Sequence, residues 1–155
     1  MHLHRSERLW LICGISTLVV FLVVLGFSAI VDGFVPPSHV QSIDPTKVAQ
    51  TPPFDNPGLH KLPNGNYEAY YVAQIFSFRP QHLVVPLGAH VTLYATSADV
   101  EHGFSVPETA INMMVTPGLV NTVSYTFTRP GKYLLICNEY CGAGHQTMAS
   151  DIEVR

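Results

Sequence analysis

Residues 122–137 read TVSYTFTRPGKYLLIC, and this stretch decides the fold class. Polar and apolar residues alternate as far as Phe127, as in a strand with one buried face. The chain then turns at residues 129–131 (RPG), and an apolar strand follows. Three other stretches share this β-branched and aromatic pattern between Pro or Gly turns: NYEAYYVAQIFSF (66–78), HLVVPLGAHVTLYATS (82–97) and ASDIEVR (149–155). Because no amphipathic helix pattern separates them, the sequence predicts an all-β domain, an antiparallel sandwich or barrel.

A single apolar run precedes this domain. LWLICGISTLVVFLVVLGFSAIV (9–31) carries no charge. A membrane-spanning helix needs about 20 apolar residues, whereas the core of a signal peptide needs only about 7–15. We therefore expect one retained transmembrane helix, with a cleaved signal peptide as the alternative. Arg5 and Arg8 precede the run and Asp32 follows it, so the positive-inside rule places the N-terminus in the cytoplasm and the β domain on the outer, periplasmic face of the plasma membrane.

Composition divides the chain into four expected segments. They are a cytoplasmic N-terminus (1–8), the transmembrane helix (9–31), a Pro-rich connector (32–64) and the exported domain (65–155). The connector holds seven of the 12 prolines, and because Pro fixes φ and lacks an N–H, we expect it to lie extended over a surface. Nearly all of the 11 acidic residues follow the apolar run, so the exported part is mildly acidic. Nucleic acid is therefore not an expected partner.

The last loop of the sequence, CNEYCGAGHQTM, concentrates side chains that bind soft metals. It holds two thiols, an imidazole and a thioether within twelve residues: Cys137, Cys141, His145 and Met148. Thiolate and thioether are soft ligands and imidazole suits copper, so the set favours copper. Zinc rarely binds Met, and iron–sulfur clusters usually need four cysteines.

One further ligand is needed to close such a site, and His102 in SADVEHGFSV (97–106) is the candidate. A mononuclear blue-copper site uses two His, one Cys and a weak axial Met. Because two cysteines are present here, two bridging thiolates with one His on each side fit a pair of copper ions better. A disulfide between Cys137 and Cys141 is the alternative interpretation.

These motifs resemble a known family. CNEYCGAGHQTM resembles the CxExCGxxHxxM loop of cytochrome c oxidase subunit II, which carries the dinuclear copper centre CuA. SADVEHGFSV resembles the segment that supplies the first histidine of that centre, and RPGKYLLIC resembles the strand before the loop. VVPLGAHVTLYATS and VTPGLVNTVSYTFTRPG also match in pattern. The resemblance covers the exported domain and the single helix, and this short form is similar to the B-type haem–copper oxidases.

The resemblance implies a cupredoxin-like Greek-key barrel with a dinuclear copper site. The implied ligands are two bridging thiolates, two terminal imidazoles, a weak axial thioether and one main-chain carbonyl: Cys137, Cys141, His102, His145, Met148 and Glu139. The implied role is to accept single electrons from a cytochrome c and pass them to haem in subunit I, where O2 is reduced to water. We expect Phe76 or Phe78 at the docking face for the electron donor.

Departures from the family bear on two further expectations. Subunits II of mitochondrial type have two transmembrane helices, and an acidic residue and an arginine between the first His and the copper loop. The corresponding stretch here, INMMVTPGLV, has neither. A magnesium ion at the Glu139 carboxylate therefore has little support.

Two other functions compete with an oxidase subunit. One is a CuA subunit of a nitric oxide reductase, since the terminal chemistry would take place in another chain. The other is a Sco-like copper chaperone, which also has CxxxC and a distant His. In that family, however, the CxxxC comes early in a thioredoxin-type domain. A quinol oxidase subunit II has lost the copper ligands that are present here.

Overall fold

The computed structural model describes residues 4–31 and 38–155, and the chain divides into two compact units, Met1–Val35 and Pro36–Arg155. The first contains one helix, α1 (Arg5–Val31), which begins four residues before the uncharged run and ends with it. None of its side chains is buried, and it is long and apolar enough to cross a membrane. The confirmed fold class is therefore all-β with one N-terminal apolar helix.

The second unit consists of two sheets packed face to face. The larger sheet has the strand order β1-β9-β6-β3-β2, with β4 paired to β3. Its strands are β1 (Ser38–Ser42), β2 (Gly58–Lys61), β3 (Tyr67–Gln74), β4 (Ser77–Arg79), β6 (His90–Ser97) and β9 (Leu119–Thr126). The smaller sheet has the order β5-β11-β10-β7-β8. Its strands are β5 (His82–Val85), β7 (His102–Ser105), β8 (Asn112–Val115), β10 (Gly131–Ile136) and β11 (Ala149–Val154).

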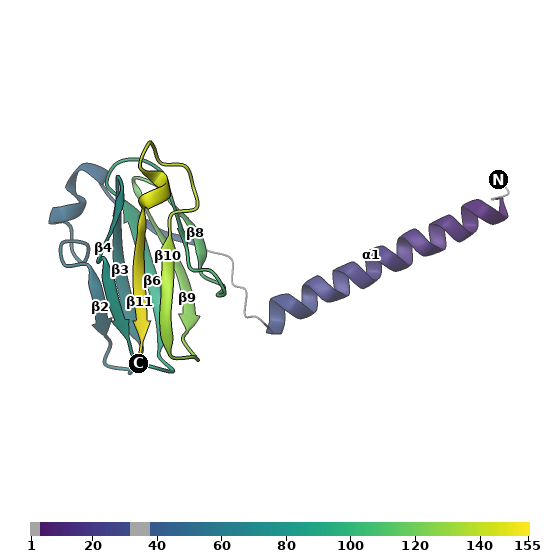
Figure 1. Ribbon diagram of the computed structural model, residues 1–155, viewed down its shortest axis with the longest axis horizontal. Coiled ribbons are helices and arrows are strands. Elements are labelled where there is room, and N and C mark those ends of the chain that lie inside the picture. The colour runs from purple at the N-terminus through teal and green to yellow at the C-terminus, as the bar shows by residue number, and fades with distance from the viewer. Residues whose placement is uncertain (1–3, 32–37) are drawn as a thin grey trace. The chain divides into compact units, whose positions relative to one another are not determined.

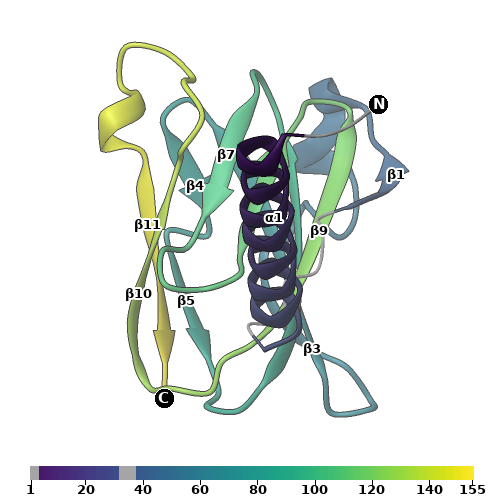
Figure 2. The same ribbon diagram turned by 90° about the vertical axis from the view of Figure 1, so that its right-hand side faces the viewer.

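The core lies between the two sheets, as the alternating sequence predicts. Figure 2 shows β10, β11 and β5 in one layer and β9 and β3 in the other. Tyr71 from the larger sheet and Phe104 from the smaller one are fully buried, and their rings meet edge to face with centroids 5.0 Å apart. Such a contact adds to the stabilisation from burying two large aromatic side chains. The two sheets, joined by these packed side chains, form the frame that holds the loops at the ends of the sandwich.

The expectation of a purely antiparallel arrangement is wrong for two strand pairs. β3 runs parallel to β6, and β5 runs parallel to β11. In both pairs the neighbours are not consecutive in the chain, so long connections carry the chain back in the same direction. Hydrophobic alternation reports which face of a strand is buried, but it carries no information about the direction of the neighbouring strand.

The stretch 66–78, which reads as one strand, forms two. β3 ends at Gln74 and β4 begins at Ser77, and these two residues pair with each other. Ile75 and Phe76 therefore form the tip of a tight hairpin. The sequence at this tip has no Gly, Asn or Pro to mark a turn.

The expected connector is largely part of the folded unit. From residue 38 onward it supplies β1, which pairs with β9, and β2, which pairs with β3. Between these strands lies a 3₁₀ helix, η1 (Pro45–Gln50), capped by Asp44. Val48 and Phe54 are buried and pack with Val72 of the larger sheet. Because these apolar residues are irregularly spaced, they give no periodic signal in the sequence.

The loop between β10 and β11 lies at the end of the sandwich opposite the C-terminus (Figure 1). It contains a single 3₁₀ turn, η2 (His145–Thr147). Among the described residues the only other helices are α1 and η1. The thioredoxin-type α/β domain that a Sco-like chaperone requires is therefore not the fold of this unit.

Candidate metal centre

Two buried thiols form the middle of the site. Cys137 directly follows β10, and its N–H donates a hydrogen bond to the carbonyl of Met148 at 3.2 Å, which closes the base of the loop. Its sulfur lies 3.8 Å from the sulfur of Cys141. Both cysteines are free and buried. The alternative of a disulfide is therefore not what the structure shows.

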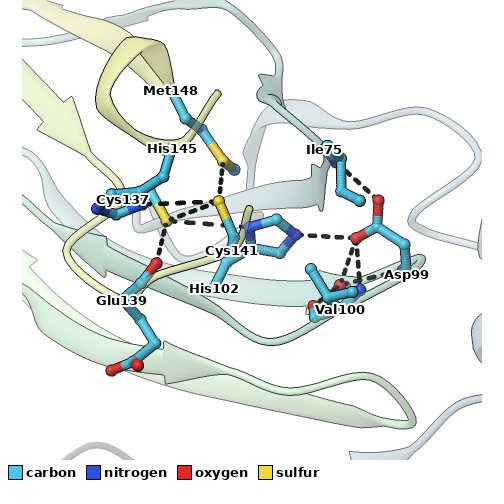
Figure 3. Close-up of polar contacts among 10 residues, drawn as sticks. Ile75, Asp99, Val100, His102, Cys137, Glu139, Cys141, His145 and Met148 are labelled. Atoms are coloured by element: carbon cyan, nitrogen blue, oxygen red, sulfur yellow. Dashed lines mark hydrogen bonds and ion pairs between the residues drawn. The ribbon is translucent and has the colours of Figure 1, made fainter. Parts of the chain in front are cut away.

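The two predicted histidines flank these sulfurs. His102 is the first residue of β7 and is fully buried, with its Nδ1 3.9 Å from the Cys137 sulfur. His145 begins η2 and is half-buried, with its Nδ1 3.6 Å from the Cys141 sulfur. In Figure 3 the two imidazole rings lie on opposite sides of the sulfur pair. Each ring is therefore associated with a different cysteine.

Met148 and the main chain of Glu139 complete the surroundings of the sulfurs. The Met148 Sδ is buried and lies 3.7 Å from the Cys141 sulfur, and the Cys137 thiol donates to the Glu139 carbonyl at 3.1 Å. The Glu139 carboxylate, in contrast, is exposed and points away from the sulfurs (Figure 3). Among the described side chains, one group of His, Cys and acidic residues could hold a metal ion: the ligand atoms of His102, Cys137 and Cys141 all lie within 4.8 Å of one another. The Glu139 carboxylate is not part of this group.

The spacing of these donor atoms fits metal ions placed between them. Metal–thiolate and metal–imidazole bonds measure about 2.3 and 2.0 Å in zinc sites of the same ligand types. Two sulfurs that share one ion can therefore lie up to roughly 4.6 Å apart, and a sulfur and a nitrogen up to roughly 4.3 Å. The separations of 3.8, 3.9 and 3.6 Å are all below these limits. Soft sulfur donors with imidazole are a set that suits copper.

Burial favours the protonated form of the Cys141 thiol. It raises the pKa of the Cys141 thiol to about 11, and the adjacent Cys137 adds to the rise. The Cys141 thiol is thus protonated at neutral pH when no metal is bound. A bound metal must displace that proton, since the thiolate is the ligand.

Asp99 holds the outer nitrogen of His102. A carboxylate can only accept, so the Nε2 of His102 donates to Asp99 Oδ1 over 2.9 Å, and Nδ1 keeps its lone pair facing Cys137. The main-chain N–H groups of Ile75 and Val100 also donate to this carboxylate. Burial raises the pKa of Asp99, but the hydrogen bonds from Ile75, His102 and Val100 outweigh it and hold the pKa below its usual value. Asp99 was not among the predicted site residues, although its place three residues before His102 was visible in the sequence.

Gly103 lets the loop between β10 and β11 lie directly on β7. A Cβ at this position would meet the main-chain nitrogens of Asn138 and Glu139 at 2.8 and 2.7 Å, closer than real Cβ contacts. The main chain of Glu139 can therefore reach the site only because residue 103 has no side chain. Sequence reasoning did not identify this residue, because the contact joins two segments far apart in the chain.

The two aromatic residues expected at a docking face have different positions. Phe78 is fully buried, and its ring packs against Phe104 with centroids 5.7 Å apart. The docking assignment is therefore wrong for Phe78, because its side of β4 faces the core. Phe76, at the hairpin tip, is half-buried and packs beside the loop between β10 and β11.

Comparisons with known proteins show which family the chain resembles. The family model described as "Cytochrome C oxidase subunit II, periplasmic domain" matches residues 69–154. Two curated proteins named "Cytochrome c oxidase subunit 2" from Thermus thermophilus are similar to the chain. The first is 40% identical over 96% of this chain and 91% of its own length. The second is 44% identical over 79% of this chain and 93% of its own length.

Solved structures show the same architecture. One chain of a haem–copper terminal oxidase dimer, determined by cryo-electron microscopy, superposes with a TM-score of 0.77 and 26% identity. The match covers 97% of this chain and all of that one. The periplasmic domain of subunit II of cytochrome oxidase from Bradyrhizobium japonicum superposes with a TM-score of 0.53 over 57% of this chain. At 20% identity, that second likeness supports the fold alone.

Proposed function

The chain belongs to the cytochrome c oxidase subunit II family, which is part of the haem–copper oxidases, and we propose that it is the electron-entry subunit of such an enzyme. In this role it accepts single electrons from a cytochrome c. It passes them to haem in subunit I, where O2 is reduced to water. The reaction with O2 therefore belongs to subunit I, and the chain described here supplies the electrons.

One observation carries this proposal: two buried sulfurs 3.8 Å apart lie between two imidazoles at one end of the sandwich. We propose that these residues, with the Met148 thioether and the Glu139 carbonyl, hold two copper ions as a CuA centre. Copper held there would supply a one-electron redox couple. The copper assignment rests on the soft donor set of this chain.

Most of the donor side chains are shielded from water and held in place. Cys137, His102 and Met148 are buried, so water has little access to the donor atoms. His102 lies on strand β7, and Cys137 directly follows strand β10. Strands in a packed sandwich move little. Asp99 fixes the tautomer of His102. A site whose ligands do not rearrange suits fast electron transfer.

We further propose the topology of the chain in its membrane. Residues 1–8 are cytoplasmic, residues 9–31 span the bilayer, and the β unit lies on the periplasmic face, where a soluble cytochrome c can reach it. The length and apolar surface of α1 support a membrane anchor, and the arginines before it support the orientation. The likeness to one chain of a terminal oxidase supports assembly with subunit I.

Electron delivery in the assembled complex tests this function. The chain is assembled with subunit I, reduced cytochrome c is added, and O2 uptake and haem reduction are followed after rapid mixing. Cys141→Ser should slow haem reduction by more than the roughly 10–100-fold that follows from losing an outer partner of a metal ligand. His90→Ala, an exposed histidine on β6, is the matched control and should leave the rate unchanged. Equal rates for wild type and Cys141→Ser would refute the proposed role.

A further inference from the structure

We propose that the tip of the β3–β4 hairpin, Ile75 and Phe76, positions both histidine-bearing segments of the centre. We name this two-residue tip the hairpin clamp. One arm runs from the main chain of Ile75 through Asp99 to His102. The other runs from the ring of Phe76 to the loop that carries His145. This inference rests on the proposed copper site and adds positioning residues to it.

The first arm is a chain of hydrogen bonds. The Ile75 N–H donates to Asp99 Oδ2 over 2.7 Å, while the other carboxylate oxygen accepts from His102 Nε2 over 2.9 Å (Figure 3). Each oxygen of Asp99 thus has a separate task. Because the two bonds share one planar carboxylate, the hairpin tip, together with the Val100 N–H that donates to Oδ1, fixes the angle from which Asp99 meets the imidazole. A ligating histidine is commonly oriented by such a partner on its other nitrogen.

The second arm is a packing contact of an aromatic ring and contains no hydrogen bond. The ring of Phe76 lies against the main chain of the loop at Gly142 and Gly144, so that a Cβ on Gly144 would sit 2.4 Å from ring atom Cδ2. Gly144 has a φ of −99°, a conformation open to any residue, so only the ring makes a side chain intolerable there. His145 is the next residue and begins η2. The ring thus packs against the backbone just before the second imidazole.

The two arms come from adjacent residues of one two-residue turn. Gln74 and Ser77 pair across this turn, so its ends are fixed by the hairpin. Displacement of the tip would loosen both arms together, although the His102 and His145 segments are far apart in the chain. With both arms of the hairpin clamp intact, the wild-type chain should release copper slowly, and the loop that carries His145 should move little. Loss of either arm should speed copper loss without unfolding the sandwich.

A double-mutant cycle tests the Phe76 arm in the full-length chain in detergent. Phe76→Ala should speed the transfer of copper to a chelator by about 10-fold or more. Gly144→Ala alone should have a similar effect, because its Cβ displaces the ring. The double variant should be no faster than Phe76→Ala, since no ring remains to be displaced. Additive effects would mean that Gly144 does not act through Phe76, and would overturn this arm.

Asp99→Asn tests the other arm with almost no change in size. The amide has one oxygen, so either the Ile75 N–H or the His102 Nε2–H then faces an amide NH2 group. We expect a 10–100-fold loss of copper affinity and, in the metal-free chain, a shift in the ¹⁵N resonances of His102 that report its tautomer. Unchanged His102 resonances together with unchanged affinity would overturn this arm.

Tyr125→Leu is the matched control for general destabilisation. Tyr125 is a half-buried aromatic residue that packs on the same core. It pairs with Val91 at the start of β6, the end of that strand away from His102. The Tyr125→Leu variant should have a lower melting temperature than the wild type but the same rate of copper release. The same rate of copper release in Tyr125→Leu and Phe76→Ala would show that Phe76 acts only through stability, which would contradict the proposal.

The metal-free chain separates this inference from the copper assignment. Amide hydrogen exchange at residues 142–147 should be faster in Phe76→Ala than in wild type and in Tyr125→Leu, whether or not copper is added. If wild type binds no copper, the proposed function fails, while this exchange measurement still decides whether the clamp holds the loop. If exchange in Phe76→Ala equals that of the control, the clamp is refuted even where the copper centre forms.

Discussion

The two histidines of the site have contrasting surroundings. His102 lies on a strand, is 0% exposed, and has its outer nitrogen held by Asp99. His145 lies on a single 3₁₀ turn and is half-buried, and its ring meets the exposed Tyr140 with centroids 5.9 Å apart. The first histidine is part of the folded core, whereas the second belongs to a loop placed on top of it.

This difference separates folding from metal binding. His102 also fills the core, so if it is a ligand as proposed, its loss should lower both the stability of the chain and its copper content. His145, on a half-exposed turn, should contribute mainly to copper binding. The following variants test this contrast in order of decreasing effect on the free energy of unfolding.

His102→Ala should have the largest effect. It removes a fully buried side chain and leaves Asp99 without its imidazole partner, so we expect a loss of about 2–4 kcal/mol in the free energy of unfolding. The copper centre should also be lost, and added imidazole should not restore it, because the position has no access from solvent. Chemical unfolding and copper content measure the two effects. A normal copper content in this variant would mean that the wrong histidine has been assigned.

Gly103→Ala should come next. Its Cβ collides with the main-chain nitrogens of Asn138 and Glu139, so the loop must move away from β7. Overpacking of this kind costs about 1–3 kcal/mol. The free energy of unfolding of the metal-free chain measures the cost, and the copper spectrum should change because the Glu139 carbonyl moves with the loop. An unchanged spectrum would show that the main chain at Glu139 does not contribute to the site.

Met148→Leu should change stability less. The two side chains have similar volumes, so the buried position should tolerate the exchange at a cost below about 1.5 kcal/mol. Copper should remain bound, but the reduction potential should rise, because the chain would lose a thioether that we propose as a weak ligand of the oxidised metal. Electrochemistry on the loaded chain measures this shift. Loss of copper in this variant would mean that Met148 is a strong ligand.

His145→Ala should change the free energy of unfolding least, by about 0.5 kcal/mol or less, as for other surface positions. Copper binding should nevertheless be lost. Added imidazole should restore the visible spectrum, since a half-exposed position admits a small ligand. The proposed difference between the two histidines would be contradicted if His102→Ala and His145→Ala responded alike to imidazole, or if they lowered the free energy of unfolding equally.

Much of this architecture could be predicted from sequence, for definable reasons. Alternation around residues 122–137 predicted buried strand faces, and the motif in the last loop pointed to copper. The structure brings the motif residues and His102 together, and their role as ligands stays a prediction. The direction of neighbouring strands and the position of one turn were harder to predict from sequence. The parallel pairing of β3 with β6 follows from long connections, and the hairpin tip at Ile75 has no residue typical of turns.

Residues that act across the fold escaped prediction for a common reason. Asp99 depends on a hydrogen bond from Ile75, and Gly103 on the approach of Asn138, and neither partner is near in sequence. Phe78 was misassigned because the hairpin turn decides which face of β4 is buried. Such contacts exist only after the sheets have packed, so a local pattern cannot contain them.

The number and electronic coupling of bound copper ions test the central claim most directly. The full-length chain in detergent is loaded with copper, its metal content is determined, and its electron paramagnetic resonance spectrum is recorded. We predict two copper ions per chain and a seven-line hyperfine pattern, because one unpaired electron would be shared equally by two copper nuclei. One copper ion per chain with a four-line pattern, or no bound copper, would contradict the account.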